Sequence, residues 1–408
     1  MDAADTTVHD IVIVGGGLVG ASLAIALDAS GLDVALVEAA PPGALPAVFD
    51  ERNLSFAEAT VHALDALGVM RHLRAPAGPI ERIHVSRAGD FGRAVLRASD
   101  YGRREFGRVV VARDLGEALE ARLRELPRLG RHRPARFIGT TCDADLREVH
   151  IEDGAGARTL RTRLLVGADG TDSAVRRALE IDAAVHDYGQ TLFVTRLRAS
   201  QAPDGTAYER FGADGPTALL PRGDRHFGLV HAVPQAEAEA VAALDEAAFL
   251  ARAQDAFGWR VGRFVSCGPR NAYAVRRVVA DALTAPRAVL VGNAAQAVHP
   301  IGAQGFNLGL RDALTLAELC TGALDANFDA GAPSTLNAYR VRREDDRART
   351  LAFSDGLVRL TSRDEPWMRP MRGAGLIAAA LVPSLQAAVV GGAMGYRGRV
   401  PALCRGPA

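Results

Sequence analysis

The sequence contains no lysine, so all 48 of its basic residues are arginine. This absence excludes mechanisms that need a lysine, such as a Schiff base or the phosphate-binding lysine of a P-loop. The 48 basic residues are balanced by 48 acidic ones, which gives a net charge of +0 at pH 7. Because no field of one sign is present to gather phosphates, we do not expect nucleic acid as a partner.

Metal-binding and disulfide patterns are also absent. The 4 cysteines are widely separated, and none stands in the CxxC spacing of a zinc or redox-disulfide site. The 10 histidines show no ligand spacing such as HExxH, so no metal is predicted. The amino terminus has two aspartates and no basic run before the first apolar segment, which argues against a secretory signal. We therefore predict reduced thiols and a cytoplasmic protein.

What is present describes an ordinary globular protein of more than one domain. The chain has 408 residues, of which 48% are hydrophobic and 24% charged. This length exceeds one typical hydrophobic core, so about two or three domains are expected.

The first segment with chemical content is a glycine loop between a strand and a helix. Ile11–Val14 is a β-branched run typical of a strand buried on both faces of a parallel sheet, and residues 21–29 place apolar side chains at helical spacing. Gly15 permits a tight turn, Gly17 lets the backbone approach a pyrophosphate, and Gly20 lets the helix pack closely on the strand. The helix start supplies N–H groups and positive potential for that anion.

An acidic residue completes this pattern. Glu38 ends a second predicted strand, residues 33–37, about twenty residues past the glycines, where a carboxylate accepts hydrogen bonds from ribose hydroxyls. A purely structural turn is the alternative for such glycines. The context predicts a dinucleotide site, but it does not separate FAD from NAD.

A second glycine turn follows the apolar run Leu164–Gly167. Asp169 and Gly170 lie at the predicted carboxyl end of this strand, where open α/β sheets bind ligands. Residues 173–179 then read as a short helix rich in arginine. An ordinary turn in which Asp169 only caps this helix remains open.

A third segment repeats the order of strand and turn. Ala288–Val291 predicts a strand, Gly292-Asn293-Ala294-Ala295 a turn, and residues 308–324 a long helix. The compact stretch between turn and helix contains His299, Pro300, Gly305, Phe306 and Asn307. Its glycines allow backbone atoms to lie against a flat ring.

Taken in order, these motifs resemble those of the class A FAD-dependent aromatic hydroxylases, whose archetype hydroxylates 4-hydroxybenzoate. Within that family the sequence is similar to the ubiquinone-biosynthesis hydroxylases, particularly the type acting on 2-polyprenyl-6-methoxyphenol. The matching stretches are Phe49-Asp50-Glu51-Arg52, Phe91-Gly92, Asp100-Tyr101-Gly102 and Asn293-Ala294-Ala295-Gln296. The resemblance covers about residues 8 to 365.

The resemblance implies an α/β fold: a Rossmann-like FAD-binding domain with an inserted antiparallel β-sheet substrate domain and a C-terminal helical segment. Alternating strands separated by Asp-Gly and Gly-Asp turns in residues 192–233 favour that sheet independently. The expected divisions are 1–182 and 276–365 for FAD, 183–275 for substrate with a contribution from 80–101, and 366–408 for the C-terminal segment.

The resemblance also implies which residues hold FAD. Gly15, Gly17, Gly20 and Glu38 would bind the ADP half; Asp169, Gly170 and Asn293 the pyrophosphate and ribityl region; Gly305, Phe306 and Asn307 the flavin end. Arg52 is expected near the pyrophosphate, and Arg113, which precedes a predicted helix over residues 115–123, is a second candidate of this kind. For Arg52 a solvated arginine at a helix start remains the alternative. Most of the family has aspartate in place of Asn293, whose amide can still bond a ribityl hydroxyl.

Two residues are candidates for the reacting centre. The family places the carbonyl of Pro300 against the substrate hydroxyl, and the proline ring holds that carbonyl rigidly. His299 is either a base, since imidazole titrates near neutrality, or a structural hydrogen-bond partner. The implied reaction hydroxylates a small apolar aromatic substrate with O2 through a flavin C4a-hydroperoxide, and NAD(P)H is the transient reductant. The pocket is expected to be apolar, because water would waste the oxidant.

The C-terminal stretch Gly375–Val390 is mostly Ala, Leu, Val and Ile, but Pro383 and Ser384 divide it. It falls short of about twenty continuous apolar residues, so we do not expect it to span a bilayer. Two interpretations stay open: a helical pair packed on the body, or a peripheral contact with the inner face of the membrane or with a biosynthetic complex. Flanking basic residues are Arg369, Arg372, Arg397 and Arg399.

Rival functions also stay open. The chain could hydroxylate a soluble phenol or another ubiquinone ring position with the same fold, or it could be a scaffold that keeps FAD for structure alone. A flavin-dependent halogenase is disfavoured, because that family relies on a lysine and on paired tryptophans, whereas Trp259 and Trp367 are isolated.

Overall fold

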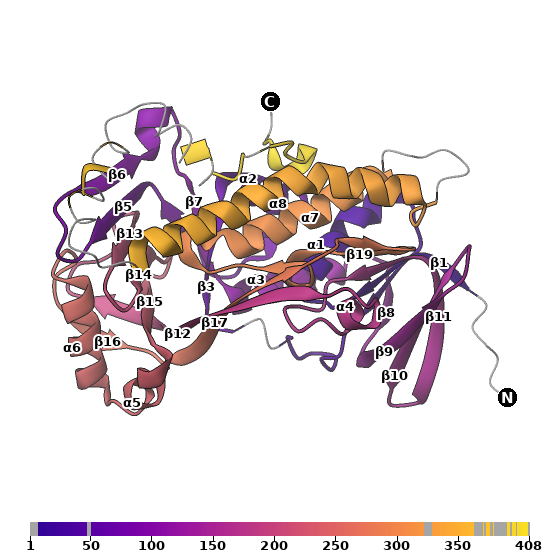
Figure 1. Cartoon of the computed structure of the whole chain (residues 1–408), viewed down its shortest axis with the longest axis horizontal. Helices are drawn as coiled ribbons and strands as arrows, with labels where there is room; N and C mark the ends of the chain where they lie inside the picture. Colours follow the sequence, from indigo (N-terminus) through magenta and orange to yellow (C-terminus); the bar gives the residue numbers. More distant parts are fainter. Residues whose placement is uncertain are drawn as a thin grey trace.

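The structure is a computed structural model of the whole chain, shown in Figure 1. It describes residues 7–46, 50–321 and 329–362, together with 370, 373–375, 378, 390–391, 394–396 and 398–406. The predicted apolar stretch Gly375–Val390 lies largely outside these residues. Within the described part, no helix is both long and apolar enough to cross a membrane. The strands form three sheets of 8, 9 and 3 strands.

The eight-stranded sheet is built around a parallel core. Its order is β18-β19-β11-β1-β2-β8, and β10 joins β11 to β9. Ile11, Val12 and Ile13 of β1 are fully buried, as a strand covered on both faces requires. The β9–β10–β11 part is antiparallel, so the sheet is mixed. The strands are β1 (Val8–Val14), β2 (Val34–Val37), β8 (Gly130–His132), β9 (Ala135–Cys142), β10 (Arg147–Asp153), β11 (Gly156–Gly167), β18 (Thr284–Ala285) and β19 (Ala288–Leu290).

Helices pack on this sheet and on one another. Helix α1 contacts both α3 and α7, and α7 contacts the long helix α8, which runs beside it in Figure 1. Helix α7 begins at Gln304, earlier than the predicted start near residue 308. The helices are α1 (Leu18–Leu27), α2 (Glu58–Ala66), α3 (Ala112–Leu123), α4 (Ala174–Ala178), α5 (Ala238–Ala242), α6 (Glu246–Phe257), α7 (Gln304–Thr321) and α8 (Pro333–Ser362).

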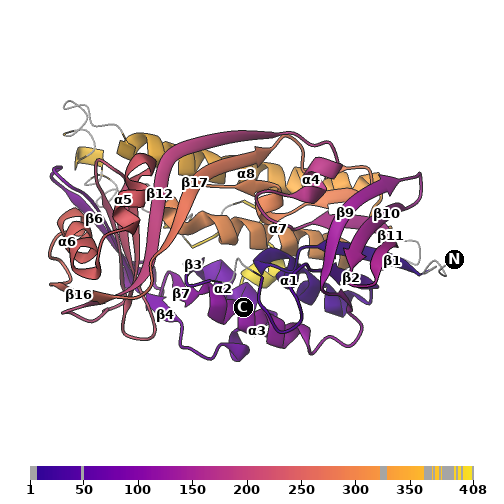
Figure 2. The same cartoon turned by 90° about the horizontal axis from the view of Figure 1, so that it is seen from below.

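The nine-stranded sheet has the order β20-β17-β12-β15-β14-β13-β5-β6, with β16 on β12. The long strands β12 and β17 of this sheet run side by side from the neighbourhood of α4 toward α6 (Figure 2). All strand pairs in this sheet are antiparallel except β13 with β5. The two strands β5 and β6 come from a segment before residue 101, far from the rest of the sheet in sequence. The strands are β5 (Arg82–Arg87), β6 (Arg93–Arg97), β12 (Ala183–Ala199), β13 (Thr206–Phe211), β14 (Pro216–Pro221), β15 (Phe227–Pro234), β16 (Phe264–Cys267), β17 (Asn271–Ala280) and β20 (Gln296–Ala297).

The two faces of this sheet have different neighbours. On what we call the outer face, Phe193 and Leu219 form a core cluster with Phe249 and Phe257 of α6. On the opposite face, which we call the inner face, side chains pack against a small separate sheet. This small sheet also contacts α2 and α3. The small sheet consists of β3 (Asn53–Ala57), β7 (Gly107–Val111) and β4 (Gly78–Ile80). A cluster of Leu192, Ala232 and Val275 on the inner face draws its members from the nine-stranded sheet alone.

Candidate functional site

Three loops meet at one edge of the eight-stranded sheet. The neighbouring strands β1, β11 and β19 are parallel, so their carboxyl ends lie side by side. We name the connections that leave these ends loop 1 (residues 15–20), loop 2 (167–170) and loop 3 (291–303). A Cβ on Gly15 would lie 2.5 Å from the carbonyl oxygen of Ala168, and one on Gly292 would lie 2.9 Å from Cγ2 of Val19. Loop 1 therefore touches both of the other loops.

Glycine is required at two positions of loop 1. Gly15 has φ +105°, which side-chain-bearing residues rarely adopt, and its α-carbon faces the main chain of Ala168. A Cβ on Gly20 would lie only 1.9 Å from the carbonyl oxygen of Gly15. These contacts account for both glycines by sheet and helix packing, before any ligand is considered.

The amino terminus of α1 lies within loop 1. Gly17 is its cap residue; no side chain caps the helix, and its first turn has no acidic residue. Glu38 lies beside this end: its Oε2 accepts a hydrogen bond from the N–H of Gly16 at 2.7 Å, and its Oε1 from the N–H of Ala40 at 2.7 Å. These bonds orient the carboxylate and leave acceptor sites on both of its oxygens. The helix end therefore suits an anion, and Glu38 suits hydroxyl groups next to it.

Asp169 of loop 2 caps helix α4. Its Oδ2 accepts hydrogen bonds from the N–H groups of Ala174 at 2.7 Å and Val175 at 3.1 Å. Its Oδ1 accepts a bond from the hydroxyl of Ser173 at 2.5 Å. The capping role that the sequence left open is therefore present in the fold.

Helix α4 also connects loop 2 to loop 3. Arg176 is buried, and its Nη1 donates to the carbonyl oxygen of Ala294 at 2.8 Å. Its Nη2 donates to the carbonyl oxygen of Thr171 at 3.0 Å. Gly170, with φ +87°, turns the chain between strand and helix.

Asp312 of α7 holds loop 3 in place by hydrogen bonds, a role that the sequence did not predict. Its Oδ2 accepts hydrogen bonds from the N–H of Gly292 at 3.1 Å and from Nε2 of Gln296 at 2.6 Å. Its Oδ1 accepts a bond from Nε of Arg343 at 2.7 Å. The sequence feature that could have indicated this role is the pair Arg311-Asp312 inside a predicted helix that is otherwise largely apolar.

A second carboxylate completes this buried network. Asp346 pairs with Arg343 at 2.8 Å and with Nε of Arg311 at 2.7 Å, and all three side chains are at most 3% exposed. Burial alone would raise the pKa of Asp346, but Arg311 and Arg343 hold it below its usual value. The network therefore keeps its charges and ties α8 to α7 and to loop 3.

His299 is buried and hydrogen-bonded at both ring nitrogens. Nδ1 accepts a bond from the N–H of Ile301 at 3.1 Å, so Nε2 carries the proton and donates to Oε1 of Gln190 at 3.3 Å. The ring of Tyr188 meets the imidazole edge-on at 4.8 Å. Burial lowers the pKa of His299 to about 4, although Asp355 opposes this shift. This geometry supports the structural alternative for His299 over the role of a base.

Pro300 and Asn293 are exposed residues of loop 3. The carbonyl oxygen of Pro300 accepts a hydrogen bond from the N–H of Ala303 at 2.9 Å, which leaves one lone pair for another donor. Ala303 has φ +52°, an uncommon value for a residue with a side chain, and Gly302 before it has φ +68°. A tight turn therefore presents Pro300 at the surface of the loop.

The first turn of α7 carries the last three predicted residues. Gly305 is half-buried there, and the ring of Phe306 lies 5.4 Å from that of Phe56. The buried side chain of Asn307 makes four hydrogen bonds, which use its whole capacity. Its partners are the N–H of Ala57 at 3.0 Å, Oγ1 of Thr60 at 2.7 Å, and the carbonyl oxygens of Ser55 at 3.1 Å and Ala303 at 2.7 Å. Only the backbone of Asn307 is left for a ligand.

The two predicted arginines have different settings. Nε of Arg52 donates to Oδ1 of Asp50 at 2.9 Å, and its guanidinium lies 4.8 Å from the ring of Tyr273. Since Arg52 immediately precedes β3, the alternative of a helix-start residue is wrong. Arg113 lies inside the first turn of α3 rather than before this helix, and it pairs with Glu51.

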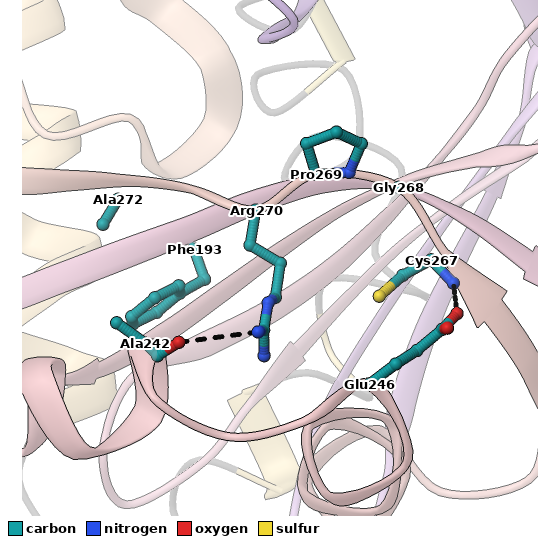
Figure 3. A pocket seen from close by; sticks show the side chains of 8 residues that line it. All are labelled: Phe193, Ala242, Glu246, Cys267, Gly268, Pro269, Arg270 and Ala272. Carbon is teal, nitrogen blue, oxygen red and sulfur yellow. Dashed lines mark hydrogen bonds between the residues drawn. The ribbon is translucent and has the colours of Figure 1, made fainter.

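A cavity of about 390 Å³ lies elsewhere, on the outer face of the nine-stranded sheet. Figure 3 shows Arg270 and Glu246 at its wall: Nη2 of Arg270 donates to the carbonyl oxygen of Ala242 at 3.5 Å, and Glu246 accepts from the N–H of Cys267 at 2.8 Å. The sheet separates this cavity from the inner face, so it is not part of the candidate site. A smaller cavity beside loop 1 is lined by Gly16, Leu36, Glu38, Glu120, Leu123, Arg131 and Arg133.

Comparison with known sequences identifies the family. Residues 8–354 match the FAD binding domain family, so the chain belongs to it. Ubiquinone hydroxylase UbiL of Rhodospirillum rubrum is 36% identical over 358 residues, which are 88% of this chain and 82% of that protein. The 3-demethoxyubiquinol 3-hydroxylase of Escherichia coli is 29% identical over 91% of this chain and 94% of its own length. The human ubiquinone biosynthesis monooxygenase COQ6 is 28% identical over 94% and 92%.

Solved structures show the same fold. The p-nitrophenol 4-monooxygenase PnpA of Pseudomonas putida superposes with a TM-score of 0.78 at 18% identity and covers 96% of this chain and 99% of its own. PqsL of Pseudomonas aeruginosa, a probable FAD-dependent monooxygenase, gives 0.75 at 23% identity, over 91% and 100%. The predicted fold class and the predicted FAD-dependent monooxygenase family are thus confirmed.

Proposed function

We propose that this chain hydroxylates the aromatic ring of a prenylated phenol in ubiquinone biosynthesis, with NAD(P)H and O2 as co-substrates and FAD held by loops 1 to 3. The observation that carries the proposal is the contact of loop 1 with both loop 2 and loop 3, because one elongated cofactor can then lie across all three. The hydroxylase relatives, whose names refer to ubiquinone, support the substrate class.

The residues present fit FAD. Its diphosphate suits the uncapped start of α1, where Gly17 lets the cofactor approach the backbone and the first turn of the helix contains no acidic residue. Glu38, already oriented by two N–H groups, suits the adenosine ribose. We assign the ribityl and pyrophosphate region to Asp169 and Asn293, and we assign Arg52 to the phosphates; Arg113, paired with Glu51, is the weaker candidate. We assign residues 1–182 and 276–365 to the cofactor and 183–275 to the substrate.

Bound FAD would supply the redox chemistry that activates oxygen for transfer to an electron-rich ring. The chain itself positions the ring and excludes water. The apolar inner-face cluster of Leu192, Ala232 and Val275 provides a dry surface for an aromatic substrate. The remaining lone pair of the Pro300 carbonyl oxygen can accept a hydrogen bond from a hydroxyl group of the aromatic ring. Neutral His299 keeps loop 3 in place through its hydrogen bonds with Ile301 and Gln190.

A prenylated substrate would partition into a membrane, so we also propose that residues 366–408 make a peripheral contact with a membrane surface or a biosynthetic complex. In the described part of this segment, Arg399 is exposed while Val400 and Cys404 are buried. This arrangement attaches the segment to the body and leaves a cation outside. Sedimentation with anionic phospholipid vesicles, compared at low and high salt, tests this contact against neutral vesicles.

Purified protein tests the main proposal directly. We expect flavin absorbance, NAD(P)H oxidation that increases when a prenylated phenol is added, and a product one oxygen heavier by mass spectrometry. Turnover of soluble phenols alone would favour a hydroxylase of another substrate class. Tight flavin with no turnover would favour the scaffold. Deletion of the gene, with the accumulated quinone precursor identified by mass spectrometry, distinguishes the ring positions.

A further inference from the structure

One carboxylate stands on the inner face of the nine-stranded sheet. Along β13, Ala207 belongs to the inner cluster and Tyr208 packs with the outer one. Since side chains alternate along a strand, Glu209 points to the inner face with Ala207. It is therefore directed toward the side of the sheet that the proposed function assigns to the substrate.

The neighbours of Glu209 across the sheet are apolar. It lies opposite Val85 of β5 and Ala218 of β14, and Ala218 in turn lies opposite Val230 of β15. Among the described residues, Glu209 has no hydrogen-bond or ion-pair partner, and its side chain keeps partial exposure. An acid in this setting is costly to desolvate, so a purely structural role gives no reason for it.

The apolar surroundings of Glu209 affect its charge. Desolvation raises the pKa of Glu209 to about 7, and no cation offsets this shift. The charged group on the inner face of the adjoining strand β5 is Arg87, which lies 3.6 Å from Asp90 and donates to the carbonyl oxygen of Gly212 at 3.2 Å. The adjoining strand β14 carries no titratable side chain. Near neutral pH the carboxyl group is thus poised between its two protonation states.

The turn after β13 is connected to loop 3. Nε2 of Gln190 donates to the carbonyl oxygen of Asp214 at 3.2 Å, while Oε1 of the same side chain accepts from Nε2 of His299. Glu209 is three residues before Gly212 in this turn, a distance of about 10 Å along an extended strand. The strand that carries Glu209 is therefore linked through Gln190 to the residue that precedes Pro300.

We propose that Glu209 contacts the aromatic substrate, accepts a hydrogen bond from its phenolic O–H, and takes up that proton as the ring is oxidised. The O–H bond of the phenol breaks, its electron pair stays on the phenolate oxygen and enriches the ring, and a new O–H bond forms on the carboxylate; the proton returns to this oxygen when product leaves. A hydroxyl donates only once, so the Pro300 carbonyl is left for the hydroxyl that the reaction introduces. This assignment rests on the proposed function.

Two variants and two probes test the proposal in the full-length, FAD-loaded protein. The variants are Glu209→Gln and Glu209→Leu, with Glu239→Gln on the exposed surface of α5 as the matched control. The probes are 2-prenylphenol and its methyl ether, which lacks the O–H but keeps the shape. The readouts are kcat, KM, product formed per NAD(P)H, and the dissociation constant of each probe from the change in flavin absorbance.

With the phenol, Glu209→Leu should lower kcat/KM on the order of 100-fold. Glu209→Gln should affect kcat more than KM and should remove the rise of kcat with pH near neutrality. With the methyl ether, wild type and Glu209→Leu should agree within about twofold in binding and in any turnover, because the contact is already missing. The control should match wild type with both probes.

The possible outcomes distinguish the role of Glu209 from the proposed function of the protein. Wild-type protein without flavin or without phenol-stimulated product would overturn the proposed function itself. An active wild type whose Glu209 variants turn over the phenol normally would overturn only the role of Glu209. Equal losses on phenol and ether would also overturn it, because a general structural defect does not depend on the substrate O–H.

Discussion

The N–H of Gly292 donates to Oδ2 of Asp312 at 3.1 Å, so the glycine turn that opens loop 3 is tied to the helix that closes it. The other oxygen of this carboxylate is held by Arg343, and both side chains are at most 3% exposed. A buried ion pair thus sets the position of a loop assigned to the flavin.

Replacing Asp312 with alanine should lower the free energy of unfolding by about 3–5 kcal/mol, because Arg343 would lose one of its two carboxylate partners while remaining buried. Urea unfolding followed by circular dichroism measures this change. Asp345→Asn is the matched control, since Asp345 forms an exposed pair with Arg349 at 2.8 Å that should be worth less than about 1 kcal/mol. A mild effect at Asp312, similar to the control, would contradict the supporting role.

Substitutions in loop 1 should separate packing from cofactor binding. Gly15→Ala forces a side chain against Ala168 at a positive φ, so the protein should lose stability and flavin together. Gly17→Leu should abolish flavin absorbance without backbone strain, because Gly17 has an ordinary φ of −70° and is the cap residue of the helix start that we assign to the diphosphate. Gly154→Ala, in an open exposed turn, is the control. A Gly17→Leu protein purified with full flavin would refute the assignment of loop 1.

The pH dependence of stability should report on His299. Its folded pKa of about 4 is below the usual 6.5, so the unfolded chain binds a proton between these values that the folded chain does not. The stabilisation is complete above pH 6.5 and is lost as the pH falls toward 4, by up to about 3 kcal/mol. His299→Asn keeps an acceptor for Ile301 without titrating, so its unfolding free energy should vary less over this window. Parallel curves for both proteins would show that His299 is not held neutral.

Glu209 should give stability the opposite pH dependence to that expected from His299. Its folded pKa of about 7 lies above the usual 4.5, so the folded state gains protons relative to the unfolded one, and stability falls as the pH rises from 4.5 through 7. Glu209→Leu should therefore be more stable than wild type at pH 8, by at most about 3 kcal/mol, with a smaller difference at pH 5. Thermal unfolding at both pH values measures it. A constant difference between them would mean that the carboxyl is not desolvated.

Exchange of Pro300 for alanine should uncouple reductant use from hydroxylation. The proline ring restrains the carbonyl assigned to a hydroxyl of the ring, and an alanine would let it move. The expected result is more hydrogen peroxide and less product per NAD(P)H consumed, at similar flavin content. Val341→Ala, on the exposed side of α8, serves as the control. Unchanged coupling would argue against placing Pro300 at the reacting centre.

The sequence predicted the elements that local pattern controls. The strands predicted at residues 11–14, 33–37 and 164–167 follow from short β-branched or apolar runs, and the glycines after the first and third follow from turns that few other residues can adopt. The helix that continues from loop 3 was predicted, but its start was placed too late, because the tight turn at residues 301–303 leads directly into it. The start of the helix that contains Arg113 was also placed too late, because the boundaries of helices are weakly encoded in the sequence.

The sequence by itself determined that three strands each deliver a flexible loop and that the chain resembles FAD-dependent hydroxylases, because glycine spacing and apolar runs are local properties. Three features were decided by the tertiary structure alone. The side chain of Asn307 is hydrogen-bonded to β3 and α2, and Asp312 forms an ion pair with Arg343 next to loop 3. Glu209 lies opposite an apolar residue of the neighbouring strand. Each of these depends on residues distant in sequence, whose hydrogen bonds and desolvation arise only when strands and helices pack together.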